Sequence, residues 1–281
     1  MTSRIKAAIL DWAGTIVDHG SLAPMGAFVR AFAELGVAID VADARGPMGM
    51  AKRDHIRAVL AVPRVAEAWR VRHGSTPDEA AMERVFAVFE PRNADSVVEH
   101  AALITGAEAT LTALAAMGVR IGSTTGYTRP IMRRLMPVAA AAGYVPEVVV
   151  CAGDLAAGRP SPLMMWHAMA AMGVWPASCV VKVDDTPVGL AEGRAAGTWT
   201  VGIALTGNIA GLDAHDLAAL SDAERATIRT QAMDEFGDLA DLVIDGIADL
   251  PAAIRTLDAR LARGDQPMAA MKPAMVTVDN T

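Results

Sequence analysis

The sequence predicts an α/β protein with a doubly wound, mainly parallel sheet and a small helical cap domain. Three observations predict this fold. Short apolar segments alternate with helical patterns along most of the chain, which is typical of a parallel sheet with helices on both faces. One stretch, residues 22–100, holds several helical patterns and no convincing strand. Hydrophobic residues make up 53% of the 281, many of them Ala, which favours helices around a substantial core.

The elements follow in chain order. Six strand-like segments lie near residues 6–11, 119–124, 147–151, 178–183, 199–205 and 241–244. The predicted domains are an α/β core of residues 1–21 and 101–263, a helical cap of residues 22–100, and a disordered tail of residues 264–281. Within the cap, Thr76 followed by Pro77 predicts a helix that starts there.

Composition excludes several classes of function. The chain has 25 basic and 32 acidic residues and a net charge of −7, which argues against a nucleic-acid or anionic-membrane partner. Cys151 and Cys179 do not make a disulfide framework, which favours a reducing compartment. No apolar run approaches the roughly 20 residues of a membrane span, and no signal-peptide pattern precedes Asp11. We therefore expect a cytoplasmic location.

The first motif is Asp11-Trp12-Ala13-Gly14-Thr15, directly after the apolar run Ala7–Leu10. The carboxyl ends of parallel strands form the ligand-binding edge of an open α/β sheet. Asp11 is therefore a candidate nucleophile facing a phosphoryl group, with backbone N–H groups of Gly14 and Thr15 available to an anion. Taken alone, an Asp in this place would equally serve as a helix N-cap.

Three further segments would meet Asp11 at the same edge of the sheet. The segment 123–127 offers hydroxyl groups and a glycine for phosphate oxygens. In the segment 158–160, Arg159 can present a fork of donors to a phosphate. The segment 182–186 carries Asp184 and Asp185, and carboxylates suit Mg²⁺. Each has a plainer explanation: a turn, a solvated loop arginine and a helix cap.

The cap contains an unusual segment from Arg45 to His55. Lys52 and His55 are three residues apart and so share one face of a helix that begins near Met50. His55 can move protons near neutral pH. Such a pair is otherwise a solvated helix face, and Met48 is otherwise a packing residue.

Together the four core segments resemble the motifs of the haloacid dehalogenase superfamily, in order and over nearly the whole chain. The resemblance implies a haloacid dehalogenase-like core, an aspartyl-phosphate on Asp11 and the cofactor Mg²⁺. It implies Thr125 and Arg159 as phosphate-binding residues. The metal ligands implied are Asp11, Asp185 and, through its backbone carbonyl, Ala13.

Ala13 marks a departure from the superfamily's phosphatases, which usually have Asp there. That second Asp protonates the leaving oxygen of an ester, and Ala13 cannot do so. A carbon leaving group needs an electron sink instead. A lysine supplies one by forming an imine with a substrate aldehyde.

With the cap segment included, the chain resembles the phosphonoacetaldehyde hydrolase family, or phosphonatases, from about residue 4 to about residue 260. The resemblance implies hydrolysis of the C–P bond of phosphonoacetaldehyde, in 2-aminoethylphosphonate degradation, by a homodimer that associates through the cap. It implies Lys52 as the Schiff-base lysine. The other residues it implies are His55 and Met48 as catalytic residues, and Tyr127 and Gly126 as substrate-binding residues.

Two positions depart from that family's pattern. Asp184 stands where the fourth motif often has Gly, which leaves open which carboxylate is the principal metal ligand. Ser21 stands where some members have Cys, so no catalytic role is expected for it.

Two other functions stay open at this point. The first is an ordinary Mg²⁺-dependent phosphate-ester hydrolase, against which Ala13 and Lys52 count. The second is a non-catalytic metabolite-binding protein that kept the fold. The dimer surface is open too, because one set of apolar residues would serve as a dimer interface or as cap core: Val59, Leu60, Val62 and Trp69.

Overall fold

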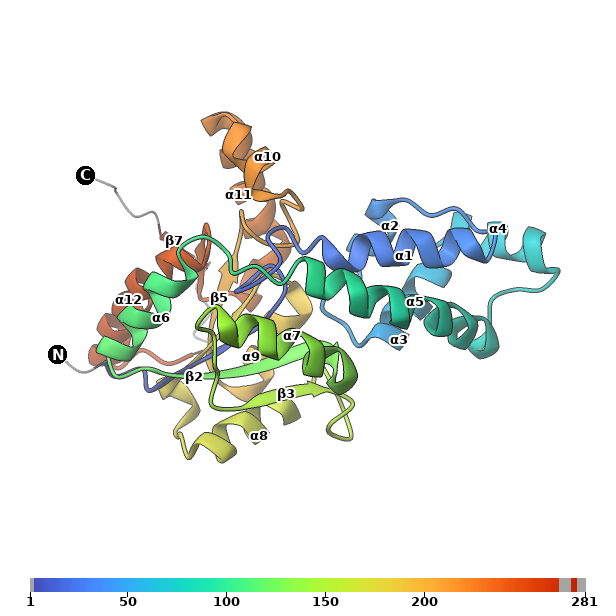
Figure 1. Ribbon diagram of the computed structural model, residues 1–281. Coiled ribbons are helices and arrows are strands. Elements are labelled where there is room, and N and C mark those ends of the chain that lie inside the picture. The colour runs from blue at the N-terminus through green and yellow to red at the C-terminus, as the bar shows by residue number, and fades with distance from the viewer. Residues whose placement is uncertain (1–2, 268–273, 277–281) are drawn as a thin grey trace.

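The computed structural model describes residues 3–267 and 274–276. It has two parts, an α/β core and an elongated helical cap that extends from one end of the sheet (Figure 1). The strands are β1 (Ala7–Leu10), β2 (Arg120–Thr128), β3 (Val149–Ala152), β4 (Val180–Asp184), β5 (Trp199–Ile203), β6 (Leu242–Ile244) and β7 (Ala274–Val276). The prediction of a doubly wound parallel α/β fold is confirmed.

The sheet order is β3-β2-β1-β4-β5-β6-β7, and every pairing is parallel. The chain winds outward from β1 to β3 and then returns to place β4 on the other side of β1. The strand order therefore reverses at β1, and ligand sites in such sheets lie at that reversal.

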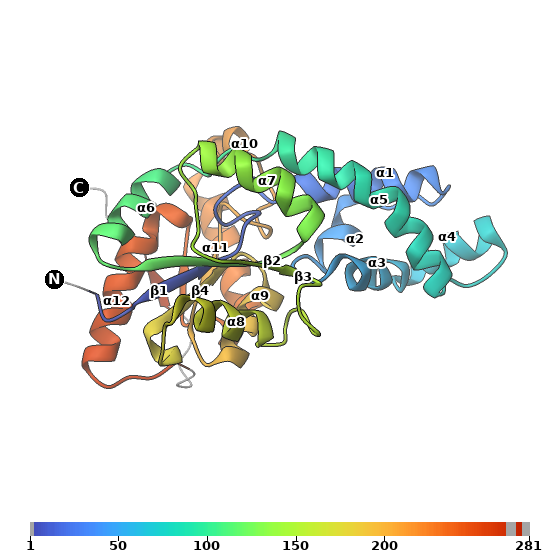
Figure 2. The same cartoon turned by 60° about the horizontal axis from the view of Figure 1, so that its bottom comes forward.

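Helices cover both faces of the sheet (Figure 2). The core helices are α6 (Ala107–Ala116), α7 (Arg129–Ala141), α8 (Leu163–Met172), α9 (Pro187–Ala196), α10 (Ala214–Ala219), α11 (Asp222–Phe236) and α12 (Leu250–Ala262), with short 3₁₀ turns at Ala177–Cys179, Gly237–Leu239 and Ile247–Asp249. Successive residues of β1 serve the two faces, since Ala8 and Leu10 pack under α6, α7 and α12 while Ala7 and Ile9 pack against α8.

The cap consists of α1 (Ala23–Glu34), α2 (Val41–Arg45), α3 (Lys52–Leu60), α4 (Pro63–His73) and α5 (Glu79–Glu99). It has its own hydrophobic core, in which Phe28 of α1 stacks on Phe89 of α5 at 4.2 Å between ring centroids. Val59, Leu60 and Trp69 are buried in that core, and Val62 packs against it. Burial thus accounts for these apolar residues without a dimer interface.

Two short linkers join the cap to the core and run side by side. Val17 and Leu103 form an antiparallel bridge, and Ile104 N donates to Ile16 O at 2.9 Å. Asp18, at a positive φ of 56°, accepts hydrogen bonds from the backbone N–H groups of Leu22 and Ala23 and so starts α1. The cap therefore leaves the core directly after the β1 loop.

Two local expectations need correction. The helix predicted to start at Thr76 is preceded instead by Asp78, whose side chain accepts from Ala81 N at 2.9 Å. The carboxylate of Asp78 caps the first turn of the helix and outweighs the signal of Pro77, one residue earlier. The second correction concerns the tail predicted for residues 264–281. Residues 268–273 and 277–281 lie outside the described part of the chain. Ala274–Val276, however, forms a strand that pairs with β6. Pairing covers an otherwise open sheet edge.

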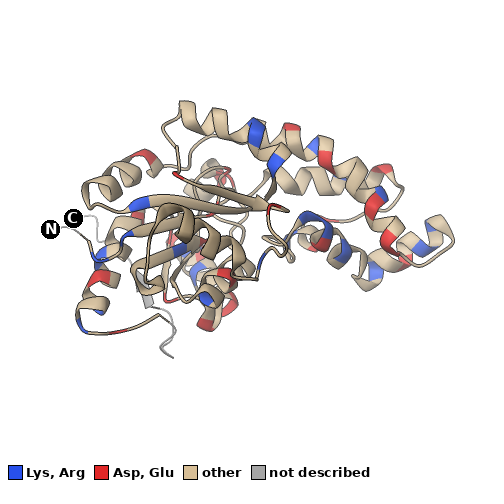
Figure 3. Cartoon of the chain, turned by 90° about the horizontal axis from the view of Figure 1, so that it is seen from below, with Lys and Arg blue, Asp and Glu red and all other residues tan. Residues whose placement is uncertain are grey.

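Charges on the cap are mixed rather than segregated. Basic and acidic residues alternate along its helices (Figure 3), with pairs such as Arg53–Glu83 and Arg70–Glu67. In the described part of the chain, no helix is both long enough and apolar enough to cross a membrane.

Candidate active site

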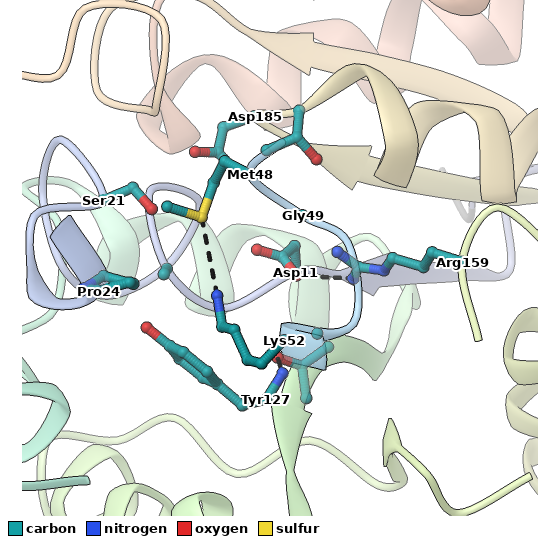
Figure 4. A pocket seen from close by; sticks show the side chains of 13 residues that line it. Asp11, Ser21, Pro24, Met48, Gly49, Lys52, Tyr127, Arg159 and Asp185 are labelled. Carbon is teal, nitrogen blue, oxygen red and sulfur yellow. Dashed lines mark hydrogen bonds and ion pairs between the residues drawn. The ribbon is translucent and has the colours of Figure 1, made fainter. Parts of the chain in front are cut away.

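A pocket lies between the cap and the carboxyl edge of the sheet. Its lining comes from both parts: Asp11, Ala13, Ser21, Pro24, Met48, Gly49, Lys52, Thr125, Gly126, Tyr127, Arg159, Asp185 and Thr186. It therefore contains all of the sequence-predicted site residues except His55. Figure 4 shows Lys52 and Met48 on one side of Asp11 and Arg159 on the opposite side.

The sheet register places the core residues of this pocket. Leu10 pairs with Ser123 of β2 and with Val183 of β4, so Asp11 lies level with Thr124 and Asp184. The backbone N–H of Asp11 donates to Val183 O at 3.0 Å and continues the ladder. The first, second and fourth motifs thus meet because their strands are neighbours that end at one level.

The loop after β1 turns closely around Asp185. Gly14 has a φ of 73°, and a Cβ atom on it would lie 2.0 Å from Asp185 Oδ2. Any larger residue would displace that carboxylate. Gly14 is therefore required for two reasons: the turn needs its positive φ, and Asp185 leaves no room for a side chain there.

Arg159 lies among three carboxylates on the core side of the pocket. Its Nη2 donates to Asp11 Oδ1 at 2.7 Å, its Nη1 is 3.4 Å from Asp184 Oδ2, and its Nε donates to Glu192 Oε2 at 3.1 Å. Nη2 also donates to the backbone carbonyl of Thr124 at 2.7 Å. The guanidinium is held firmly beside Asp11, where a phosphoryl group attacked by that carboxylate would lie.

Lys182 and Glu192 extend this buried network. Lys182 Nζ lies 3.1 Å from Asp184 Oδ2 and 3.5 Å from Glu192 Oε2, and it donates to Thr124 Oγ1 at 2.7 Å. Sequence reasoning missed roles for Lys182, Glu192 and Thr124. A lysine within an apolar strand was a usable signal, whereas Glu192 on a helix carries no sequence mark of its burial.

Asp11, Asp184 and Asp185 are a candidate cation site. All three are buried, and each offers a carboxylate oxygen within 4.8 Å of the other two. Burial and Asp184 raise the pKa of Asp11 to about 6, against the lowering effect of Arg159. Burial, Asp184 and Asp11 raise the pKa of Asp185 well above its ordinary value. A cation would offset the crowding of these like charges.

The two aspartates of the fourth motif differ in what surrounds them. Asp184 Oδ1 accepts from the N–H and hydroxyl of Thr186 at 3.0 and 2.7 Å, while Oδ2 faces Lys182 and Arg159. Asp185 Oδ2 accepts from Asn208 N at 2.7 Å, while its buried Oδ1 has no hydrogen-bond partner. That free oxygen fits a hard cation such as Mg²⁺. Asp184 Oδ2 forms no hydrogen bond either, but it lies 3.1 Å from Lys182 Nζ. Among the described residues, Asp185 is therefore the one of the two with a buried oxygen that has neither a hydrogen bond nor an ion pair.

Lys52, on the cap side, has an apolar and aromatic environment. Only 5% of the residue is exposed, and its Nζ lies 3.9 Å from Met48 Sδ. The same ammonium is 5.4 Å from the centroid of the Tyr127 ring and 5.6 Å from that of Phe28. Burial lowers the pKa of Lys52 to about 8, with Arg159 acting in the same direction and Asp11 against it. A lysine with this pKa is available as a neutral amine near physiological pH.

His55 lies behind Lys52 and does not line the pocket. Its ring packs on Phe28 at 4.1 Å between centroids, and Nε2 is 2.6 Å from Ala44 O. Burial and the nearby Lys52 lower the pKa of His55 well below its ordinary value. The geometry therefore favours a neutral imidazole that supports α3, whereas the sequence predicts a proton carrier.

The remaining predicted residues lie in the pocket wall. Thr125 is buried, and its hydroxyl accepts from Tyr127 N at 3.1 Å. Gly126 meets the cap closely, since a Cβ atom on it would lie 3.2 Å from Gly49 O. The buried hydroxyl of Tyr127 has no hydrogen-bond partner. Ser21 lines the pocket as well, although the sequence suggests no role for it.

Comparison with known proteins identifies the family. A family model for haloacid dehalogenase-like hydrolases matches residues 5–197. The chain is 48% identical over 264 residues to the phosphonoacetaldehyde hydrolase of Paraburkholderia xenovorans, covering 94% of this chain and 99% of that protein. It is 43% identical over 269 residues to the one from Nitratidesulfovibrio vulgaris, covering 95% of each chain.

Solved structures show the same family and the same fold. A phosphonoacetaldehyde hydrolase-like protein from Oleispira antarctica superposes with a TM-score of 0.92 at 38% identity, covering 95% of this chain and 98% of that one. The β-phosphoglucomutase of Clostridium difficile shares the fold at a TM-score of 0.62 and 15% identity, covering 92% of this chain and 99% of its own. The chain therefore belongs to the haloacid dehalogenase-like hydrolases and, within them, to the phosphonoacetaldehyde hydrolase family.

Proposed function

We propose that this chain hydrolyses the C–P bond of phosphonoacetaldehyde to acetaldehyde and phosphate. The observation that carries the proposal is the position of Lys52, a buried lysine with a lowered pKa that shares one small pocket with Asp11. Ala13 lies in the same pocket and offers no proton for an ester oxygen. The pocket thus combines a nucleophile for phosphorus with an amine for an aldehyde, as a substrate carrying both groups requires.

The first covalent step occurs on the cap side. The neutral amine of Lys52 adds to the aldehyde carbon, and loss of water leaves an imine. Met48 and the rings of Phe28 and Tyr127 surround that amine and keep bulk water from it. The substrate is then tethered with its phosphonate directed toward Asp11 and Arg159.

The second step occurs on the core side. Asp11 attacks phosphorus, the C–P bond breaks, and its electron pair moves into the imine to give an enamine on Lys52. Arg159 holds the attacking carboxylate and neutralises phosphoryl oxygens, and Thr125 adds a hydroxyl. Protonation of the enamine carbon and hydrolysis of the imine release acetaldehyde. Water then hydrolyses the aspartyl-phosphate, so that one water is consumed overall.

Mg²⁺ belongs to this proposal as the cofactor. Asp11, Asp185 through its free Oδ1, and the backbone carbonyl of Ala13 would hold it. When bound, it offsets the charge of the clustered carboxylates and of the phosphonate, so that anionic groups can approach one another. The residues of the chain carry the covalent steps.

The proposal extends to cellular context and assembly. Phosphonoacetaldehyde is an intermediate of 2-aminoethylphosphonate degradation, which makes that route the proposed role, and the proposed location is the cytoplasm. A homodimer formed through the cap is part of the proposal too. Sedimentation velocity would test it, with a single-chain mass of 29.3 kDa as the result that contradicts it.

Two measurements test the activity. Phosphate release from phosphonoacetaldehyde, with Mg²⁺ and with chelator, should require the metal and should greatly exceed release from an aryl phosphate. The reverse preference would favour the ester hydrolase, and binding without release would favour a metabolite-binding protein. Borohydride added during turnover should attach a two-carbon group to Lys52. Full turnover with no trapped adduct at this residue would overturn the imine step.

A further inference from the structure

Arg45, the last residue of α2, reaches from the cap to the core. Its Nη1 donates to the backbone carbonyl of Asn208 at 2.8 Å and lies 3.2 Å from the carbonyl of Gly20 in the β1 linker. In return, Asn208 Nδ2 donates to the carbonyl of Arg45 at 3.5 Å. One guanidinium thus connects the cap, the linker and a core loop.

The core loop 206–212 is shaped to receive this guanidinium. Gly211 has a φ of 60°, and a Cβ atom there would lie 2.4 Å from Arg45 Cζ. The linker joins the same loop, since Gly20 N donates to Thr206 O at 2.8 Å. A side chain at Gly211 would therefore exclude Arg45 from its place.

The same loop orients Asp185. The N–H of Asn208 donates to Asp185 Oδ2 at 2.7 Å, and a Cβ atom on Gly207 would lie 2.3 Å from Asp185 Cβ. This hydrogen bond and the close approach of Gly207 orient the carboxylate, whose Oδ1 is buried and without a hydrogen-bond partner. Asn208 therefore links the two side chains. Its carbonyl accepts from Arg45, and its N–H donates to Asp185.

We propose that Arg45 is a positioning residue that couples docking of the cap to the orientation of Asp185. The inference rests on the proposed function, in which Asp185 holds Mg²⁺. When the cap docks, Arg45 clamps the loop and Asn208 presents its N–H to Asp185. When the cap leaves, the clamp is lost and the carboxylate rotates more freely. Docking of the cap thus brings Lys52 into the pocket and orients Asp185 at the same time.

The test compares Arg45→Met with the wild type and with Arg64→Met. Arg64 is a matched control because its ion pairs, with Asp40 and Asp43, lie within the cap. Calorimetric titration with Mg²⁺ alone should show about tenfold weaker binding for Arg45→Met, as is usual when a residue that orients a metal ligand is lost. Arg64→Met should match the wild type, and Arg45→Lys, which keeps a donor, should fall between them.

Hydrogen–deuterium exchange without metal supplies a second measurement. In Arg45→Met the segment 206–212 should exchange at least severalfold faster, while the strands of the sheet keep their wild-type rates. A Mg²⁺ affinity equal to that of the wild type would overturn the coupling, and so would unchanged exchange in this segment. Failure of the wild type to bind Mg²⁺ would overturn it as well.

Neither measurement involves substrate, so the inference and the proposed function fail separately. A chain that does not cleave phosphonoacetaldehyde, but whose Arg45→Met variant still loses Mg²⁺ affinity and loop protection, would refute only the proposed activity. Efficient cleavage together with an unaffected metal affinity in Arg45→Met would refute only the role of Arg45.

Discussion

The two sides of the pocket hold their cations in opposite ways. On the core side, Arg159 and Lys182 lie among the buried carboxylates of Asp11, Asp184 and Glu192. On the cap side, Lys52 takes part in none of the ion pairs found among the described residues, and its contacts are a thioether and two aromatic rings.

This difference separates two kinds of chemistry. Ion pairs favour the charged form of a group, whereas burial without a counter-ion favours the neutral form. The core side therefore keeps the guanidinium of Arg159 charged for an anionic phosphoryl group, and the cap side prepares a neutral amine for an aldehyde. Asp11 lies between Lys52 and Arg159 in the pocket (Figure 4).

The largest expected effect is the loss of C–P cleavage in Lys52→Arg. The variant keeps a positive charge but cannot form an imine, so phosphate release should fall by at least about 1,000-fold. A coupled phosphate assay measures it, with Arg53→Lys on the exposed side of α3 as the control. A nearly normal rate in Lys52→Arg would show that charge alone is needed on the cap side.

The next effect concerns stability on the core side. Lys182→Met removes one of the two buried cations that face Asp184 and Glu192, and Arg159 is the other. Breaking a buried ion pair by removing one partner typically costs about 3–5 kcal/mol of unfolding free energy. Urea unfolding with Mg²⁺ absent would measure the loss. A loss below about 1 kcal/mol would mean that this cation is as dispensable to the fold as the one on the cap side.

Replacing the cap-side lysine by methionine, in Lys52→Met, should raise the free energy of unfolding instead of lowering it. The folded-state pKa of Lys52, about 8, lies below the ordinary lysine value of 10.5, so the unfolded chain binds more protons between these pH values. Lys52→Met should therefore stabilise the protein by about 3 kcal/mol at pH 7. The gain should be complete below pH 8 and vanish as the pH rises to 10.5. Unfolding curves across that range check it, and destabilisation at pH 7 would contradict it.

The smallest effect is expected for Tyr127→Phe. The phenol hydroxyl is buried without a hydrogen-bond partner, and the ring that faces Lys52 remains. Stability should change by less than about 1 kcal/mol, and borohydride trapping on Lys52 should keep its dependence on pH. Tyr127→Ala removes the ring and is the informative comparison. A large loss in Tyr127→Phe would assign a direct role to the hydroxyl.

Local patterns were enough for most of the fold. The apolar runs matched the first six strands because a parallel strand covered on both faces must be apolar along its length. Helix boundaries were harder, as the start at Asp78 shows, because neighbouring residues compete to cap the same turn. The pairing of Ala274–Val276 with β6 carried no local pattern, since an edge strand forms only when its partner is in place.

Within the site, the sequence by itself determined the residues that bring chemistry with them. Asp11, Arg159 and Asp185 follow predicted strands or turns at one edge of the sheet, and the motif around Lys52 resembles a known family. Only the tertiary structure decided what each group contacts. Glu192 reaches Thr124 across 68 residues, and Asn208 lies 163 residues from Arg45. Protonation, metal geometry and docking depend on such distant contacts, because burial and charge act through space and not along the chain.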